Sequence, residues 1–316
     1  MRASGKPRFA GRVVPSLALG AYLAMLLITY LKLIEEKELA LRFGQEYLEY
    51  LADRIDNNHL YKINGNTLGN HYSLTKLMWM RDHQADLYAR ADYFLHWSSF
   101  IAYMLGADPL LDYSLANRTL LFDLDKAAWS PELAELANID LLKLPPLVPS
   151  GTAIGTVSPG IASELGFLPG VTIISGAHDQ CANAVGSGVL HASQAFYGMG
   201  SYHCIVPVLD ERLDASVMVP RGLNTEHHAV TGKYVSFLYN HGGTLVKWFR
   251  NTYATLEHQR ARQQGRDIYD QLFAELPDQL SSILVIPNFA ATGTPEFLTD
   301  TCGVMYGLHL ETSRGD

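Results

Sequence analysis

A carboxylate at a predicted strand-to-helix turn is the strongest candidate for chemistry in this chain. The β-branched run from Val171 to Ile174 predicts a buried strand that ends at Ser175 and Gly176. The small residues after Asp179 predict a closely packed helix. Because the carboxyl ends of strands in α/β sheets open onto ligand crevices, Asp179 is placed to meet a substrate hydroxyl. The alternative interpretation is that Asp179 only caps the helix.

Metal binding by cysteine or histidine is not indicated. The three cysteines, Cys181, Cys204 and Cys302, lack metal-ligand spacing and are typical of reduced thiols in a core. His227 and His228 are adjacent, and neighbours on a strand point to opposite faces, so they do not readily share one ion. We therefore expect no metal site formed by side chains alone.

Charge and length exclude some function classes. The chain has 316 residues, a net charge of −8, 48% hydrophobic and 18% charged residues. This composition predicts about two globular domains. No basic stripe with interleaved aromatic residues follows the first dozen residues, so we expect no nucleic-acid partner. The sequence also lacks a Gly-x-x-x-x-Gly-Lys loop and a Gly-x-Gly-x-x-Gly fingerprint.

Residues 13–31 form a run of 19 residues without a charge, preceded by a basic start. About 20 apolar residues span a bilayer as a helix, so this run predicts a membrane span with its amino terminus on the cytoplasmic side. A signal peptide is one alternative, although the run exceeds the usual apolar core and no small-residue cleavage site follows it. A buried core helix is the other alternative.

The periodicity of the remaining chain predicts the elements that position Asp179. Residues 73–105 predict two helices with core-facing stripes, formed by Leu74, Leu77, Met78 and Met80 in the first and by Phe94, Trp97, Phe100, Ile101 and Met104 in the second. Strands are predicted at 195–197, 204–209 and 235–238, and a helix at 244–260. Loop residues predict breaks near 52–64 and 190–195.

A series of motifs in residues 56–316 resembles the FGGY family of carbohydrate kinases. The matching segments, in order, are His71 to Trp79, Ala91 to Leu95, Asp112 to Asp123, Leu144 to Pro146, Gly151 to Gly155, Gly176 to Gln180, Tyr197 to Tyr202, Pro287 to Phe289, Gly293 to Pro295 and Tyr306 to Leu308. Single motifs of this kind are weak, but their order over some 260 residues is specific.

The resemblance implies a role for several residues. Asp179, in Gly-Ala-His-Asp-Gln, matches the family's catalytic base, and the turn that contains Gly198, Gly200 and Ser201 resembles the one that approaches the nucleotide phosphates. The implied reaction is phosphoryl transfer from ATP, with Mg²⁺, to a hydroxyl of a small sugar or polyol. Side chains that could hold the sugar are His71, Asp112, His178 and Asn240.

Two family features are missing from the sequence. No Asp-x-Gly-Thr phosphate loop occurs, and the chain ends before the region in which the family places its glycine-rich adenosine loop. We therefore expect a truncated protein that is weakly active or inactive.

A second resemblance covers residues 10–52. The spacing Glu-Glu-x-x-Leu-x-x-x-Phe-Gly-x-Glu-Tyr-x-x-Tyr is similar to the carboxyl-terminal end of the isoprenylcysteine carboxyl methyltransferase family. The family's upstream methyl-donor segment is absent, so an active methyltransferase is not expected. The alternative is a solvated helix with charge pairs four residues apart.

These observations predict an α/β chain, a partial actin-like (ribonuclease H-like) two-domain sugar kinase fold preceded by a transmembrane helix. The expected parts are residues 1–55, a methyltransferase-like tail, residues 56–192, the remainder of the kinase's first domain, and residues 193–316, the start of its second. The family implies a cytoplasmic kinase portion, with membrane association through residues 13–31 and a homo-oligomer as further expectations. Alternatives are a membrane-anchored methyltransferase-like fragment and a non-catalytic sugar-binding product of a fused gene.

Overall fold

The computed structural model describes residues 44–293, 298 and 300–316. Residues 44–52 are helical. The further α-helices, in chain order, are α2 (Asn57–Asn64), α3 (Ser73–His83), α4 (Ala85–Arg90), α5 (Trp97–Leu105), α6 (Tyr113–Asn117), α7 (Pro131–Ala137), α8 (Pro159–Leu165), α9 (Asp179–Gly186), α10 (Ala215–Met218), α11 (Gly243–Tyr253), α12 (Thr255–Gln263) and α13 (Ile268–Ala274). Two 3₁₀ turns are η1 (Leu141–Lys143) and η2 (Val219–Arg221).

The strands form one larger sheet and four pairs. In the larger sheet β8 (Tyr202–Leu209) is central and antiparallel to β7 (Ala195–Met199), β10 (Tyr234–Val235) and β11 (Leu238–His241), and β9 (Glu226–His227) pairs with β10. The pairs are β1 (Leu111–Asp112) with β4 (Leu147–Val148), parallel, and, antiparallel, β2 (Phe122–Asp123) with β3 (Ala128–Trp129), β5 (Ala153–Thr156) with β6 (Thr172–Ile174), and β12 (Leu284–Ile286) with β13 (Val304–Tyr306).

Helix α2 has a capping residue at each end, and the glycine that ends it also contacts a distant segment of the chain. Asp56 caps its start, since its Oδ1 accepts the N–H groups of Asn58 and His59 at 2.8 and 3.1 Å. Gly65 ends the helix with φ of 80°, a left-handed conformation. A Cβ at this glycine would lie 2.0 Å from the carbonyl oxygen of Thr225, whose N–H donates to the Gly65 carbonyl at 2.8 Å. The glycine therefore lets a distant segment approach.

The largest core lies among the helices of the first half. It joins side chains from α2, α3, α7 and the 120–121 segment, all nearly fully buried, such as Leu60, Leu74, Leu120, Leu121 and Leu133. The core-facing stripe predicted in the first helix of 73–105 is confirmed for Leu74, Leu77 and Met78, which are at most 7% exposed.

The second stripe predicted for the core is wrong for its four members in α5, although Phe94, which precedes that helix, is partly buried against the first core. Trp97, Phe100, Ile101 and Met104 of α5 are 67, 41, 54 and 55% exposed, and Ser99 lies on the buried side. The helical period was correct, but the face that packs within the described chain is the opposite one. The strand predicted at 171–174 is present as β6, but it is not a buried strand, because only its Ile173 is buried.

The predicted element boundaries also need correction. Residues 73–105 form three helices, since Gln84 interrupts the helical backbone between α3 and α4. The helix expected at 244–260 is divided at Ala254, which has φ of −138° and is fully buried. The strand expected at 235–238 is split between β10 and β11, although the strands predicted at 195–197 and 204–209 are present.

Within the described residues, no helix is long and apolar enough to cross a membrane. The run at residues 13–31 lies outside the described residues. So does most of the segment that resembles a methyltransferase tail, apart from the helical residues 44–52.

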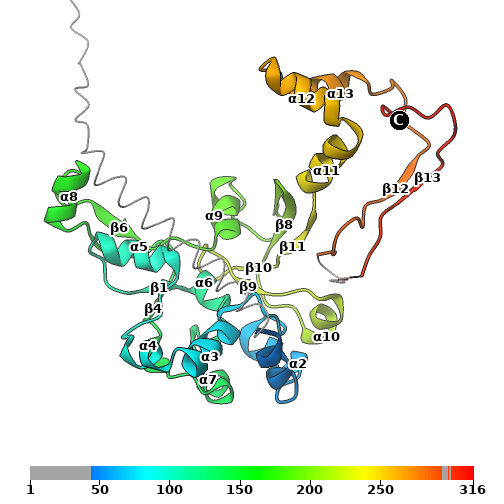
Figure 1. Ribbon diagram of the computed structural model, residues 1–316. Helices are drawn as coiled ribbons and strands as arrows, with labels where there is room; N and C mark the ends of the chain where they lie inside the picture. Colours follow the sequence, from blue (N-terminus) through cyan, green and yellow to red (C-terminus); the bar gives the residue numbers. More distant parts are fainter. Residues whose placement is uncertain (1–43, 294–297, 299) are drawn as a thin grey trace, which may run out of the picture.

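The carboxyl-terminal elements lie to one side of the helical body (Figure 1). Helices α11, α12 and α13 follow one another, and the β12–β13 hairpin runs beside them. Together they surround an apolar cavity of about 690 Å³, lined by side chains such as Trp248, Phe273, Val285 and Met305.

Candidate active site

Asp179 is the first residue of α9, directly after the turn that leaves β6. The residue before it, His178, occupies the N-cap position and makes no side-chain cap. The Asp179 side chain is 76% exposed, and its Oδ1 accepts the N–H of Gln180 at 2.7 Å. The structure therefore places this carboxylate in the first turn of a helix that follows a strand. The alternative interpretation required Asp179 at the N-cap position, which His178 occupies.

Helix α9 holds Asp179 against the larger sheet, because it contacts both β7 and β8. Its inner face is formed by Cys181 and Ala184, both fully buried. Cys181 packs with Val206 and Val235, and its thiol lies 3.8 Å from the carbonyl oxygen of His227. Burial raises the pKa of this thiol, so Cys181 behaves as a small core residue.

The turn before Asp179 is also held by the first half of the chain. Asp112 is 3% exposed, and its Oδ1 accepts hydrogen bonds from the Ser114 hydroxyl at 2.5 Å, the Leu115 N–H at 3.2 Å and the Ser150 hydroxyl at 3.3 Å. The Ser114 hydroxyl accepts the N–H of His178 at 2.8 Å. Burial raises the pKa of Asp112, although its donors oppose that shift. Asp112 is thus linked to the turn through the Ser114 hydroxyl.

The imidazole of His178 lies between the turn and the sheet. Its ring centroid is 4.9 Å from that of Phe237, and its Nδ1 is 3.4 Å from Oδ1 of Asp179. Burial lowers the pKa of His178, with Glu226 opposing the shift. The ring is therefore neutral at pH 7.

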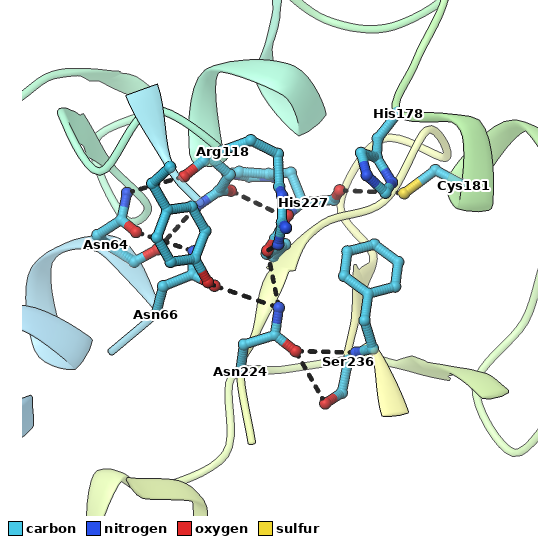
Figure 2. Close-up of polar contacts among 12 residues, drawn as sticks. Asn64, Asn66, Arg118, His178, Cys181, Asn224, His227 and Ser236 are labelled. Atoms are coloured by element: carbon cyan, nitrogen blue, oxygen red, sulfur yellow. Dashed lines mark hydrogen bonds and ion pairs between the residues drawn. The ribbon is translucent and has the colours of Figure 1, made fainter. Parts of the chain in front are cut away.

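A buried polar network joins segments that are far apart in sequence (Figure 2). Arg118 Nη1 donates to Oε1 of Glu226 at 2.6 Å, and Asn224 Nδ2 donates to the same oxygen at 2.7 Å. Asn224 also donates to Oδ1 of Asn66 at 3.2 Å, an oxygen that accepts the Tyr72 hydroxyl at 2.8 Å. Glu226 is fully buried and is neutralised here by Arg118.

Sequence reasoning did not identify this network. Its residues lie in four separate segments, and none has a motif that indicates a buried ion pair. The only local signal was the clustering of Asn64 and Asn66 around Gly65, which predicted a loop and not a shared core. Asn64 is in fact fully buried, and it exchanges hydrogen bonds with Asn117.

A series of ring contacts connects His71 with the Asp179 turn. His71 lies against Tyr72 with ring centroids 3.9 Å apart, and the guanidinium of Arg118 lies 4.8 Å from the Tyr72 ring and 5.9 Å from that of Phe237. Phe237 in turn contacts His178. His71 and His178, two of the predicted sugar-binding residues, therefore lie at the two ends of one series of ring contacts, whose middle residues Tyr72 and Phe237 are buried.

Two further charges affect His71. Its side chain reaches solvent at one edge, yet desolvation of the ring, together with the nearby Arg118 and Lys76, lowers the pKa of His71 to about 4. The Lys76 ammonium donates to the carbonyls of Asn70, His71 and Tyr72 at 3.2, 2.9 and 2.7 Å. This loop thus offers a neutral imidazole and a fixed cation.

The turn with Gly198, Gly200 and Ser201 joins β7 to β8. Gly198 pairs with Cys204, and the N–H of Gly200 donates to the Tyr202 carbonyl at 3.1 Å. The Gly200 carbonyl accepts the N–H of Gly243 at 2.8 Å, which joins the turn to the start of α11. Gly200 and Ser201 are exposed, so the turn is open to a ligand, but one of its amides is already used by the hairpin.

Asn240 belongs to a different part of the sheet. It pairs with His203 on β8, and its Oδ1 accepts the N–H of His241 at 2.8 Å and that of Gly293 at 3.5 Å. None of these contacts involves the Asp179 turn. Among the described residues, no group of three metal-ligating side chains is close enough to hold an ion.

The comparisons with known proteins agree with this architecture. Residues 42–186 match the N-terminal domain of the FGGY family of carbohydrate kinases. The chain is 27% identical over 268 residues to the xylulose kinase of Staphylococcus epidermidis, covering 83% of this chain and 51% of that protein. It is 24% identical over 269 residues to the gluconokinase of Bacillus licheniformis, covering 84% and 52%.

Solved structures show the same fold. A xylulose kinase from Rhodospirillum rubrum superposes with a TM-score of 0.71 at 22% identity, over 85% of this chain and 53% of that one. The Plasmodium falciparum glycerol kinase with ADP superposes with a TM-score of 0.71 at 17% identity, over 86% and 53%. The fold is therefore the mixed α/β, actin-like fold of sugar kinases. The chain spans about half the length of the curated relatives that it matches.

Proposed function

We propose that Asp179 is the base of a site for ATP-dependent phosphorylation of a sugar or polyol hydroxyl, in a chain whose residues 42–186 match the N-terminal domain of the FGGY family of carbohydrate kinases. The observation that carries this proposal is the placement of the Asp179 carboxylate. It is exposed at the start of α9, between a turn held by the first half of the chain and the sheet of the second half. An alternative is a site that binds a sugar without transferring phosphate.

The proposed chemistry follows from that placement. As the substrate hydroxyl attacks the γ-phosphorus of ATP, a new oxygen–phosphorus bond forms and the bond to the β-phosphate oxygen breaks, releasing ADP. The hydroxyl proton passes to Asp179, which must lie within hydrogen-bond reach of it. The neutral imidazoles of His71 and His178 could each donate to or accept from sugar hydroxyls.

The nucleotide is proposed to lie toward the β7–β8 turn, where Gly200 and Ser201 are exposed. Glycine permits close approach of the backbone to phosphate oxygens. Mg²⁺ accompanies ATP in this proposal, but the described residues do not form a site for the ion by themselves. We therefore assign no step of the reaction to protein-held magnesium.

We expect little or no turnover from the 316-residue chain. The sequence has no Asp-x-Gly-Thr loop, and preorganised phosphate contacts supply much of the acceleration in this chemistry. Removing one such donor typically costs about 10²–10³ in rate.

The test is ATP turnover over a panel of pentuloses, hexuloses, aldonates and polyols, with Asp179→Ala as the control. Weak turnover that Asp179→Ala removes supports the base assignment. Turnover that survives this substitution contradicts it, and robust turnover contradicts the expected low rate. Sugar binding measured by calorimetry, without any turnover in a panel that includes Mg²⁺, favours the non-catalytic alternative.

We also propose that residues 13–31 insert into lipid, because this run has 19 residues and no charge. Carbonate extraction of membranes from cells that express the chain measures insertion. Complete recovery of the protein in the soluble fraction would contradict this proposal.

A further inference from the structure

Asp112 is a buried carboxylate for which the phosphoryl transfer described above has no use. It lies at the end of β1, paired with Val148 of β4, and is 3% exposed. Its Oδ1 accepts three donors, which come from Ser114, Leu115 and Ser150. A carboxylate at this depth costs free energy unless it is satisfied by hydrogen bonds, so its position indicates a purpose within the fold.

The contacts of Ser114 show what Asp112 holds. The Ser114 side chain is fully buried, and its hydroxyl has a single proton, which it donates to Asp112 at 2.5 Å. The hydroxyl oxygen is then oriented to accept the N–H of His178 at 2.8 Å. A charge-assisted hydrogen bond to Asp112 thus fixes the serine that fixes the backbone of the turn before Asp179.

The side chain of His178 lies next to the carboxylate itself. Its ring is buried against Phe237, and its Nδ1 faces Oδ1 of Asp179 at 3.4 Å. Asp179 is 76% exposed and accepts one backbone N–H, so few other contacts restrict its rotamer. The imidazole lies beside this carboxylate without a hydrogen bond to it, so the backbone of the turn, which Ser114 holds, places Asp179.

We propose that Ser114 is a positioning residue, through which buried Asp112 fixes the backbone that places the Asp179 carboxylate. The inference rests on the proposed function only in taking Asp179 as the base. A base must lie within about 2.6–3.2 Å of the proton that it accepts. A misplacement of the base by about 1 Å can lower the rate about 10²-fold, so contacts that fix this turn contribute directly to catalysis.

The first experiment measures hydrogen exchange of backbone amides in the full chain, and it does not require turnover. Ser114→Ala removes the acceptor for the His178 N–H, so we expect exchange at residues 176–180 to become at least about tenfold faster, with protection in α3 and α7 unchanged. Ser150→Ala is the matched control, since the Ser150 hydroxyl also donates to Asp112, whereas the His178 N–H donates to Ser114. It should leave exchange at 176–180 unchanged.

Ser114→Thr keeps the hydroxyl and tests rescue. Restored protection at 176–180 supports the proposal. Equal exchange in Ser114→Ala and the unsubstituted chain would overturn it, as would a loss of protection spread evenly over α3, α7 and 176–180, because that result describes a general structural role.

The second experiment applies if the unsubstituted chain turns over. Ser114→Ala should lower kcat by about 10–100-fold and leave KM for ATP unchanged, and Ser114→Thr should recover most of kcat. An increase in KM for ATP with constant kcat would contradict positioning. If no sugar in the panel is phosphorylated, which the expected low rate allows, the exchange experiment alone decides whether Ser114 holds the turn.

Discussion

The two ends of the described chain use similar apolar residues to different effect. In the first half, leucines of α2, α3 and α7 are nearly fully buried in one core. In the last segment, from α11 to β13, Leu284 and Tyr306 on the paired strands are 60 and 74% exposed, and α11 has no buried residue. The comparison shows that an apolar composition and a regular spacing of apolar residues do not by themselves produce a buried core. A second layer must lie against the apolar face.

The same lesson applies inside the first half. Helix α3 buries its stripe because α2 and α7 lie against it, whereas α5 exposes a stripe with equally good helical spacing. Three variants, each paired with a control variant, and one titration can break or sharpen the comparison.

The largest effect is expected from Arg118→Met. The variant leaves the fully buried Glu226 carboxylate without its cation, which typically costs about 3–5 kcal/mol of unfolding free energy. The matched control is Arg250→Met in α11, where the guanidinium donates hydrogen bonds to the neutral side chains of Asn251 and Tyr269. That variant should change stability by about 0.5 kcal/mol or less. Urea unfolding followed by circular dichroism measures both, and equal losses would contradict the contrast.

Leu121→Ala should lower the unfolding free energy by about 3 kcal/mol, since it opens a cavity at a fully buried position. Leu284→Ala, on the exposed face of β12, should cost about 0.5 kcal/mol or less. Thermal unfolding of the two variants is the measurement. A large loss for Leu284→Ala would mean that β12 is covered in solution.

Gly65→Ala should cost about 2 kcal/mol or more. The residue has φ of 80°, and an added Cβ would lie 2.0 Å from the backbone carbonyl of Thr225. Gly265→Ala is the control at a similar φ of 64°, with no atom within 4 Å of the added Cβ, so only the backbone strain of about 1 kcal/mol remains. The difference between the losses of unfolding free energy in the two variants measures the cost of the contact between the added Cβ and Thr225. Equal losses would contradict that contact.

The smallest effect is a pH dependence from His71. Its pKa is lowered from 6.5 in the unfolded chain to about 4 in the folded protein, so the unfolded chain binds more protons between these values. The stability contribution is fully present above pH 6.5 and is lost as the pH falls toward 4. Urea midpoints at pH 7 and pH 5 should therefore differ less in His71→Gln than in the unsubstituted chain. An identical difference in both would show that His71 does not contribute.

Some features of the site could be predicted because they depend on neighbours in sequence. The strand at 172–174, the helix after it and the place of Asp179 between them follow from β-branched residues, glycine and small residues within one short segment. The sequence could not show that Asp179 lies one residue after the N-cap, because only the backbone geometry distinguishes these two positions. The domain boundary proposed near residue 192 remains a prediction.

The sequence by itself determined the helical period of residues 73–83 and the motif that contains Asp179, because these depend on contacts within a few residues. Only the tertiary structure decided which face of α5 is covered, that Glu226 meets Arg118 across 108 positions, and that Asp112 is buried and linked to the Asp179 turn through Ser114, and not open to a ligand. Those outcomes depend on which distant surfaces meet, and burial free energy is set by the layer that covers a residue and not by its own type.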